Sequence, residues 1–366
     1  MKKISKKQNR SKRDAKPEYT VGLDVGDRTS SYCMLDSESE LMEEGKLRTT
    51  EASLRKQFGD DVRMRIALEA GGHSAWIERL LKELGHEVIV ANPRRLPLIT
   101  SSESKNDRND AYQLAQLAAV NPKLLSPIQH RGVERQQDLN LIRTRAVVVR
   151  ARTMLINAVR GLVKSAGGRI PSCSSDSFAD KARASVPPEL RAACAPLLEQ
   201  IAQMKLTISV MDQQVEELEK KYPEVAVLKT VPGVGPLVAA CYVLTMDSPH
   251  IGNTNRQAGA FLGLRPKQSQ SGASDPQNRI SRTGNTYLRS LLVQSAQRIL
   301  WPFGTPSALR EWGLRLAGSG GKRGKQRAIV AVARKLAVML YSMWRSGRKF
   351  DPFPQGSTQT TTPIAA

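Results

Sequence analysis

Four acidic residues stand where a metal-dependent nuclease needs them. Asp24 ends one apolar run, Glu69 ends another, and Asp107 and Asp110 open a predicted helix. Carboxylates at strand ends and at a helix start can converge on one point, and a cluster of oxygen ligands holds Mg²⁺ or Mn²⁺. Two such ions about 4 Å apart clamp the attacking and leaving oxygens of a phosphodiester. The residue types therefore predict a two-metal site for phosphodiester chemistry.

Each acid also has a plainer interpretation. The run Gly22–Gly26 resembles the start of actin-like sugar kinases, although Gly71-Gly72 is the only nearby candidate for a further phosphate loop. Taken alone, Glu69 fits a surface glutamate. Asp107 and Asp110 are three residues apart, so they share a helix face and can aim at one ion pair. Either could instead cap the helix N-terminus. The tetrad as a set favours the metal site.

The charge of the chain indicates a polyanionic partner. Its 366 residues carry 56 Lys+Arg against 34 Asp+Glu, a formal net charge of +22. A membrane surface is the competing polyanion. No apolar run reaches the roughly 18 residues of a spanning helix. The longest candidate, Ile329–Trp344, is interrupted by Arg334 and Lys335. We therefore expect nucleic acid, with no membrane association.

The cysteines and the N-terminus fit a cytoplasmic protein. The four cysteines show no Cys-x-x-Cys spacing, which argues against a zinc knuckle or a disulfide scaffold. The basic N-terminus has no apolar h-region, so it is not expected to be a secretory signal. Residues 1–18 and 351–366 are predicted to be disordered tails, the first basic and the second rich in Thr, Gln and Pro.

The pattern of residues 19–130 predicts a mixed α/β domain. Alternating and apolar runs predict strands, and helical spacing follows the fourth of them. The expected strands cover 20–25, 31–35, 41–48, 63–68 and 87–90, and the expected helices cover 76–84 and 110–120. Strands in antiparallel order come first, followed by a strand–helix–strand unit, so a mixed sheet is expected.

Residues 131–222 are predicted to form long coiled-coil helices. After a break rich in Gly, Ser and Pro, apolar residues alternate four and three apart, which is a heptad seam. The seam comprises Leu197, Ile201, Met204, Ile208, Met211, Val215 and Leu218. A dimerising coiled coil and an intramolecular helical hairpin explain this spacing equally well, and both predict a helical linker.

Residues 223–350 are predicted to be a separate helical domain. The turn Val231–Pro236 resembles a helix-hairpin-helix turn, in which the backbone N–H groups of Gly233 and Gly235 and a helix N-terminus receive a phosphate oxygen. An ordinary tight turn is the alternative. The final helix is expected over 326–344, with Ala331, Leu336, Val338 and Leu340 in the core.

A Ser/Gly-rich loop follows Pro266. No histidine lies nearby to act as a base, so a hydrolase triad is not supported. A serine beside bound metal ions could still attack a phosphate. The basic residues of this segment could line a DNA backbone, and those predicted to bind nucleic acid are Lys267, Arg279, Arg282 and Arg289.

These motifs together resemble the DEDD transposases of the insertion sequence 110 type, over roughly Tyr19–Gly347. The resemblance rests on seven stretches. They are Gly-Leu-Asp-Val-Gly, Leu-Glu-Ala, Lys-Asn-Asp-Arg-Asn-Asp-Ala, Val-Pro-Gly-Val-Gly, Leu-Gly-Leu-x-Pro with Ser-Gly, Thr-Gly-Asn-x-Tyr-Leu-Arg and Ala-Arg-Lys-Leu-Ala.

The resemblance implies an RNase H-like (RuvC-like) N-terminal domain, a coiled-coil linker and a mainly α C-terminal transposase domain. It carries the metal ligands onto Asp24, Glu69, Asp107 and Asp110, with two Mg²⁺ expected. The family's nucleophilic serine aligns with Ser271. Because Gln270 and Ala273 replace family residues around it, Ser269 and Ser274 stay open as alternatives.

The resemblance further implies a recombinase that cuts and rejoins double-stranded DNA through a serine-linked intermediate. Family members assemble the active site from two subunits, so a homo-oligomer (dimer or tetramer) is expected. They choose target and donor with a structured RNA that their own element encodes. Two other functions stay open on the residues alone: a junction-resolving nuclease that uses water, and a nonenzymatic nucleic-acid binder.

Overall fold

The computed structural model describes residues 17–60, 62–93, 106–248, 254–271, 274, 276, 278–318 and 320–354. The chain divides into two compact units, Met1–His130 and Arg131–Ala366, and each is described by itself. Residues 1–16 and 355–366, which make up most of the two predicted tails, lie outside the described residues. Pro352, within the second predicted tail, accepts a hydrogen bond from the Ala308 N–H at 2.8 Å.

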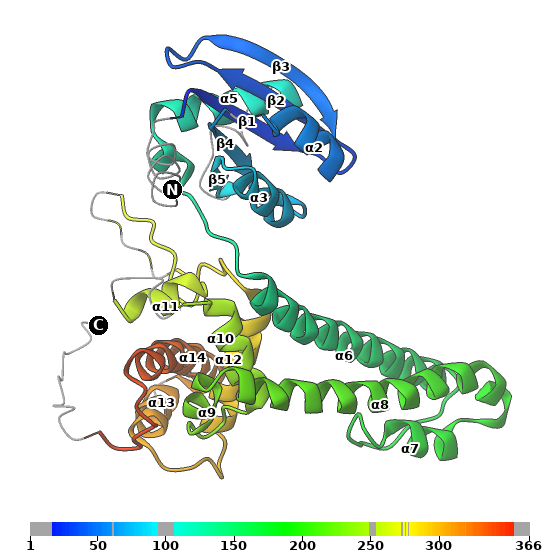
Figure 1. Cartoon of the computed structure of the whole chain (residues 1–366). Helices are drawn as coiled ribbons and strands as arrows, with labels where there is room; N and C mark the ends of the chain where they lie inside the picture. The colour runs from blue at the N-terminus through cyan, green and yellow to red at the C-terminus, as the bar shows by residue number, and fades with distance from the viewer. Residues whose placement is uncertain are drawn as a thin grey trace. The chain divides into compact units, whose positions relative to one another are not determined.

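The first unit contains a five-stranded mixed sheet in the order β3-β2-β1-β4-β5 (Figure 1). Strand β2 runs antiparallel to both β1 and β3, and β4 and β5 run parallel to β1. The strands are β1 (Tyr19–Val25), β2 (Thr29–Leu35), β3 (Leu41–Arg48), β4 (Met64–Glu69) and β5 (Glu87–Ala91). The predicted α/β character of this unit is confirmed.

Helices cover both faces of the sheet. On one face, Leu23 and Leu68 pack in a core with residues of α2 (Glu51–Phe58) and α3 (Ser74–Glu83). The other face carries α5 (Asp107–Val120), and it includes small residues such as Ala67 and Ala91 beside the larger Leu35 and Ile89. The close approach of α5 to β1 occurs at Gly22, where no side chain separates helix from strand. The short 3₁₀ helix η2 (Pro122–Leu125) follows α5.

The middle segment is an antiparallel helical hairpin, made of α6 (Val133–Ser165) and α8 (Arg191–Lys221) with α7 (Phe178–Ser185) and the 3₁₀ helix η3 (Pro188–Leu190) at the connection (Figure 1). The start of α6 shares a core with the end of α8, and the end of α6 shares another with the start of α8. The heptad spacing therefore serves a contact within the chain.

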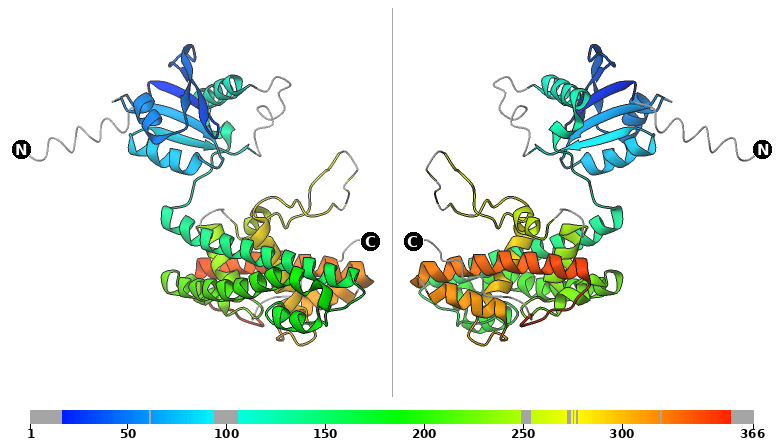
Figure 2. Two further views of the ribbon diagram at one scale, coloured as in Figure 1. Left: turned by 90° about the vertical axis from the view of Figure 1, so that its right-hand side faces the viewer. Right: turned by 90° about the vertical axis from the view of Figure 1, so that its left-hand side faces the viewer.

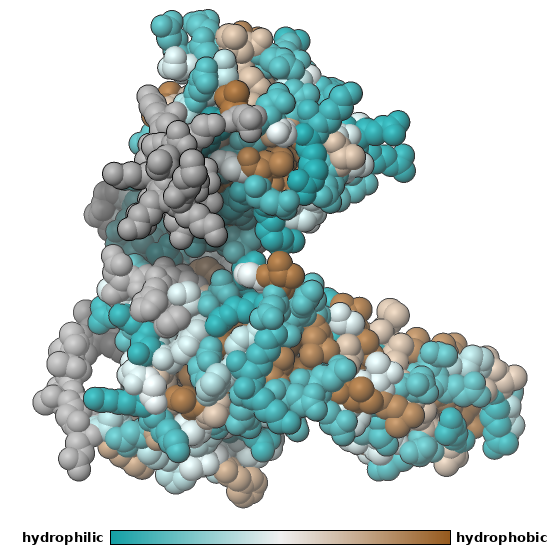
Figure 3. All heavy atoms as spheres, in the orientation of Figure 1, coloured by the Kyte–Doolittle hydropathy of each residue, from teal (hydrophilic) through white to brown (hydrophobic). Residues whose placement is uncertain are grey.

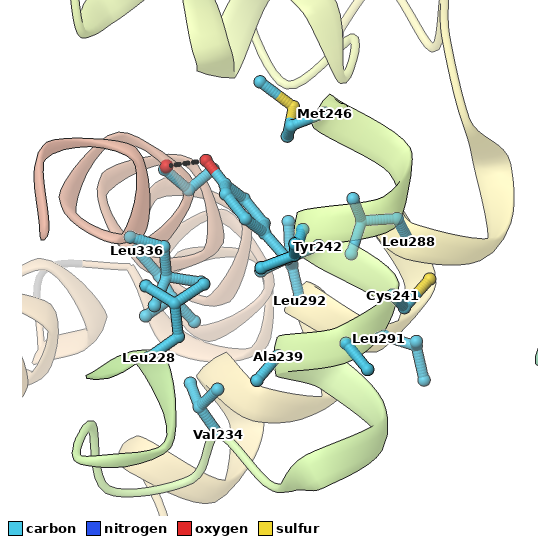
Figure 4. Packing of buried hydrophobic residues seen from close by; sticks show 14 of the residues in the cluster. Leu228, Val234, Ala239, Cys241, Tyr242, Met246, Leu288, Leu291, Leu292 and Leu336 are labelled. Atoms are coloured by element: carbon cyan, nitrogen blue, oxygen red, sulfur yellow. Dashed lines mark hydrogen bonds between the residues drawn. The ribbon is translucent and has the colours of Figure 1, made fainter. Parts of the chain in front are cut away.

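The remaining helices form a compact bundle joined to the base of this hairpin. They are α9 (Glu224–Lys229), α10 (Pro236–Met246), α11 (Arg256–Phe261), α12 (Thr286–Ile299), α13 (Ala308–Gly318) and α14 (Gly321–Ser346). Tyr242 of α10 lies at the centre of the packing, where its hydroxyl donates to the carbonyl oxygen of Ala337 at 2.6 Å (Figure 4). This bond satisfies a polar atom that burial would otherwise leave at a cost.

Helix α14 also corrects two of its predicted core positions. Leu336 and Leu340 are fully buried, as predicted. Ala331 and Val338 are only half-buried and line a surface groove, while Val332 and Ala337 fill the core instead. Val332, Leu336 and Leu340 are spaced by four residues and share the buried face, whereas Ala331 and Val338 fall on the opposite side of the helix. Across the residues that the structure describes, no helix has the length and hydropathy to cross a membrane.

Candidate active site

Asp24 and Glu69 lie side by side at the ends of neighbouring parallel strands. The register pairs Leu23 with Leu68, so Asp24 and Glu69 follow at the same level. Because successive side chains alternate between faces and Leu23 and Leu68 point to the α2/α3 side, the two carboxylates point to the α5 side. Ala91 is paired with Glu69 and packs on that same side, which agrees with this assignment.

Helix α5 brings the other two acids to this face. Gly22, two residues before Asp24, lies directly beneath the helix: a β-carbon added there would meet the Ala111 carbonyl oxygen at 1.9 Å. Asp110 immediately precedes Ala111 in the first turn, and Asp107 begins the helix. Two of the four predicted metal ligands therefore lie on one face of the sheet, and the other two lie in the first turn of the helix that covers this face.

The helix cap separates the two interpretations of these aspartates. The N-cap is Asn106, whose side chain accepts a hydrogen bond from the Arg108 N–H at 3.2 Å. Neither Asp107 nor Asp110 is therefore the capping residue. The Arg108 guanidinium pairs with Glu44 of β3, with its Nε at 2.6 Å from Oε2, which fastens the helix start to the sheet.

The donor set suits a hard divalent cation, because all four predicted ligands are carboxylates. Their backbone positions fit such a group, since two strand ends and a helix start face one another. The side chains as they lie are not closed into a metal cage: within the described residues, no group of three or more His, Cys, Asp or Glu is close enough to hold an ion. Like charges repel in the absence of a cation, so binding requires these side chains to be drawn together.

A hydrogen-bonded pair that the sequence did not predict joins the segments after the two strand acids. His73 Nε2 lies 3.3 Å from Asp27 Oδ1, and the Trp76 indole N–H donates to His73 Nδ1 at 3.0 Å. Because Nδ1 accepts, the proton of the neutral ring is on Nε2 and is donated to Asp27. Asp27 follows Asp24 by three residues and His73 follows Glu69 by four. The pair links the two segments at the surface.

The predicted nucleophile lies on a loop of the second unit. The base of the loop is a short bridge in which the Lys267 N–H donates to the Arg279 carbonyl at 2.9 Å. Near its tip, Ser271 and Ser274 exchange two backbone hydrogen bonds, of 3.2 and 3.0 Å. Ser269, Ser271 and Ser274 are all exposed, so the structure leaves each hydroxyl accessible. Figure 2 shows the loop projecting from the helices of its own unit.

The predicted nucleic-acid ligands divide into exposed and enclosed residues. Lys267, Arg279 and Arg282 are exposed. Arg289 is only 9% exposed, and its Nη1 donates to the carbonyls of Leu262 at 3.0 Å and Thr283 at 2.9 Å. These bonds close the base of the serine loop, so the visible role of Arg289 is to position that loop.

The two turn glycines also differ. Gly233 has φ +87°, and a β-carbon there would lie 3.2 Å from the Ser295 carbonyl oxygen of α12. It is therefore a packing residue between helices. Gly235 is exposed, and a β-carbon there would meet nothing within 4 Å. Gly235 is the N-cap of α10, so its surroundings leave room for a phosphate. Gly233, besides packing on α12, lines a pocket that also includes Arg298.

Two family models match the chain. Residues 21–167 match the DEDD transposase model of the IS110 type, described as a transposase, and residues 225–309 match the transposase model of the IS116/IS110/IS902 family. The first match contains all four acids and the second contains the serine loop. The chain is therefore a transposase.

Relatives along the whole length agree with this class. The chain is 27% identical over 352 residues to the transposase for insertion sequence element IS1111A of Coxiella burnetii, covering 93% of this chain and 92% of that one. It is 27% identical over 331 residues to a probable family 20 transposase of Pseudomonas aeruginosa, covering 88% and 96%. A pilin gene-inverting protein of Moraxella lacunata is 28% identical over 150 residues, 40% of this chain and 45% of that protein. The chain belongs to the IS110 family of transposases.

Proposed function

We propose that this transposase cuts and rejoins DNA phosphodiesters with a metal-binding carboxylate tetrad and a serine nucleophile. The tetrad is Asp24, Glu69, Asp107 and Asp110, and the nucleophile is Ser271. The observation that carries the proposal is the strand register, which places Asp24 beside Glu69 on the sheet face that α5 covers. The RNase H-like fold belongs to the same proposal, supported by a 3-2-1-4-5 sheet with β1 antiparallel to β2 and parallel to β4.

The reaction is balanced without an external energy source. The Ser271 hydroxyl gives up its proton to solvent, its oxygen bonds to the scissile phosphorus, and the bond from phosphorus to the 3′-oxygen breaks. That oxygen takes up a proton and leaves as a 3′-hydroxyl. Attack by a 3′-hydroxyl on the serine-linked phosphate then reverses the exchange. Each step breaks one phosphate ester bond and forms another, so ATP is not needed.

The residues of the tetrad bind and orient in this scheme. Two Mg²⁺ ions held there would stabilise charge on the phosphate and favour the ionised serine hydroxyl. The carboxylates neutralise that cationic charge and fix its position, and the helix start adds a favourable field for the anionic phosphate. Mn²⁺ has the same preference for oxygen ligands and would serve as a substitute.

The partners follow from the family and from the surface. Double-stranded DNA of the element ends and of the target is the substrate, and a structured guide RNA is proposed to select the sites. A homo-oligomer is proposed to supply carboxylates and serine from different copies. Apolar side chains on the outside of the hairpin support self-association (Figure 3), among them Met154 at 65% and Leu206 at 60% exposure.

A trapping assay with Ser271→Ala tests the proposal. The full chain is incubated with a labelled DNA end and Mg²⁺, and covalent adducts are separated under denaturing conditions. The expected result is an adduct with the unchanged protein and none with Ser271→Ala, while DNA binding is equal for both. Matched variants Ser269→Ala and Ser274→Ala should keep the adduct. Cleavage by Ser271→Ala without an adduct would instead assign water as the nucleophile.

A further inference from the structure

A groove of about 1320 Å³ lies on the second unit beside the serine loop. The chain segment that follows the loop contributes Arg279, Ile280 and Arg282 to the lining. Helix α14 contributes most of the remaining lining residues, and α13 contributes Trp312. All of these residues belong to one compact unit, so the groove does not depend on how the two units are placed.

The cationic side chains of α14 form one stripe along this groove. Arg323, Arg327 and Arg334 are spaced by four and seven residues, which keeps them on one helix face. From Arg323 to Arg334 the helix rises about 16 Å at 1.5 Å per residue. That length matches about five stacked nucleotides at roughly 3.4 Å each. The stripe can therefore follow a nucleic-acid backbone over several phosphates.

The groove carries positive charge without internal compensation. Its lining includes six arginines and one lysine and no acidic residue among the described ones. Within the described part of the chain, none of the six guanidinium groups has a carboxylate within 4.0 Å: Arg256, Arg279, Arg282, Arg323, Arg327 and Arg334. Burial, and after it the nearby charge of Arg315, lower the pKa of Lys335. A surface with this excess of positive charge favours a polyanionic ligand.

The apolar residues in the lining of the groove favour an unpaired strand over a duplex. Ile280, Val330 and Val338 are half-buried apolar residues that remain partly open to solvent in the lining. A duplex presents phosphates and sugars outward and keeps the faces of its bases stacked inside. An unpaired strand exposes base faces that can rest on apolar groups while its phosphates meet arginines. A groove lined by half-buried apolar residues and by exposed arginines suits the second arrangement.

We propose that this groove holds an unpaired DNA strand that leads to or from the phosphate beside the serine loop. The inference rests on the proposed function for the choice of DNA, because the serine would attack the DNA strand that lies beside its loop. Continuity carries that choice: Pro266 and Ile280 pair across the base of the loop and both line the groove. A strand bound here would run directly toward Ser271.

Binding by the full chain to a labelled unpaired 12-nucleotide DNA tests the groove. In Arg323→Gln/Arg327→Gln, the dissociation constant should rise roughly tenfold to a hundredfold, since two charge-assisted phosphate contacts are lost. The slope of log K against log salt should also fall by about 1.4, at about 0.7 per phosphate of a single strand. The matched control is Lys322→Gln/Lys325→Gln, which removes two charges from the same turns of α14 but outside the groove lining. It should change affinity less than threefold.

The remaining outcomes are equally decisive. Equal losses in the two double variants, or unchanged binding in the groove variant, overturn the proposal. So does a groove effect confined to duplex DNA or to RNA of the same sequence. A photoreactive base in the DNA should cross-link to residues 278–282 and 323–334, and cross-links elsewhere would contradict it. Ser271→Ala should bind the strand as the unchanged protein does. If the unchanged protein gave no covalent adduct but still bound the strand in the groove, the proposed serine chemistry would be rejected and the groove proposal would stand.

Discussion

A β-carbon on Gly22 would lie 1.9 Å from the carbonyl oxygen of Ala111. No side chain can be accommodated at that distance, so Gly22 sets how closely α5 approaches β1. Asp24 follows Gly22 by two residues and Asp110 precedes Ala111 by one. The separation of these two carboxylates therefore depends on the absence of a side chain at position 22.

Gly22→Ala should displace the start of α5 and weaken both stability and activity. Overpacking of this kind lowers the free energy of unfolding by about 1–3 kcal/mol, which urea unfolding measures. DNA cleavage should fall further than stability explains, because two of the proposed metal ligands, Asp107 and Asp110, move with the helix. Gly72→Ala is the control, since a β-carbon there meets nothing within 4 Å. Similar behaviour of the two variants would show that the close contact does not position the tetrad.

Removal of one strand carboxylate should abolish cation uptake. In Asp24→Asn the heat of Mg²⁺ binding, measured by isothermal titration, should disappear, and cleavage should fall roughly a hundredfold to a thousandfold. DNA binding should be retained, because the basic surfaces are unchanged. Chelation of divalent ions should likewise lower DNA cleavage by the unchanged protein and leave its DNA binding intact. Glu38→Gln, an exposed acid in the turn after β2, provides the control; if it abolished uptake equally, the tetrad would not be the site.

The sheet could be predicted from sequence because its strands are apolar or alternating runs that contrast with the polar segments around them. Each predicted strand is present to within two residues, since buried runs such as Val21–Leu23 leave little choice of structure. Helix α2 was not predicted: it buries only Leu54 and Phe58, and its remaining residues apart from Ala52 are polar. Its local signal is the Thr50 cap, whose hydroxyl accepts from the Ser53 N–H at 3.3 Å.

Features that depend on tertiary contacts could not be predicted. The seam through Ile208 and Val215 predicted a helical partner without saying which one, and that partner proved to be α6 of the same chain. Arg289 resembled the other cations of its segment, and only the fold shows that carbonyls occupy its guanidinium. The bond between Asp27 and His73 joins residues 46 positions apart, so no local pattern indicated it.

The buried carboxylate of Glu78 predicts a loss of stability in acid. Its side chain is 7% exposed and contacts Lys82 at 2.6 Å and the His130 ring. Burial raises its pKa, but hydrogen bonds from Lys82 and His130 outweigh burial, so the pKa lies below its ordinary value of 4.5. A carboxyl with a depressed pKa stabilises the fold above pH 4.5, and this contribution is lost as the pH falls through the lower, folded-state value.

Thermal unfolding between pH 7 and pH 3 measures this effect. Glu78→Gln should be less stable than the unchanged protein at pH 7, by about 1–3 kcal/mol. The difference between them should shrink below pH 4.5, because only the unchanged protein takes up the extra proton. Glu83→Gln, on the same helix but with a side chain 65% exposed, should show almost no change. A constant difference across the pH range would contradict the assignment.

The outer face of the hairpin predicts how copies of the chain associate. Leu206 and Val210 are 60% and 55% exposed and lie four residues apart on α8, so they form one apolar surface. Burial of this surface against a second copy would stabilise an oligomer, whereas a charge placed there would have to be desolvated. Leu206→Glu/Val210→Glu should therefore raise the dissociation constant of the oligomer at least about a hundredfold, as read by light scattering across a dilution series. Gln200→Glu/Ser209→Glu adds the same two charges at exposed polar positions of α8 and should leave the mass unchanged. If the Leu206/Val210 variant kept the oligomer intact, association through this face would be wrong, and the shared active site would need another contact between copies.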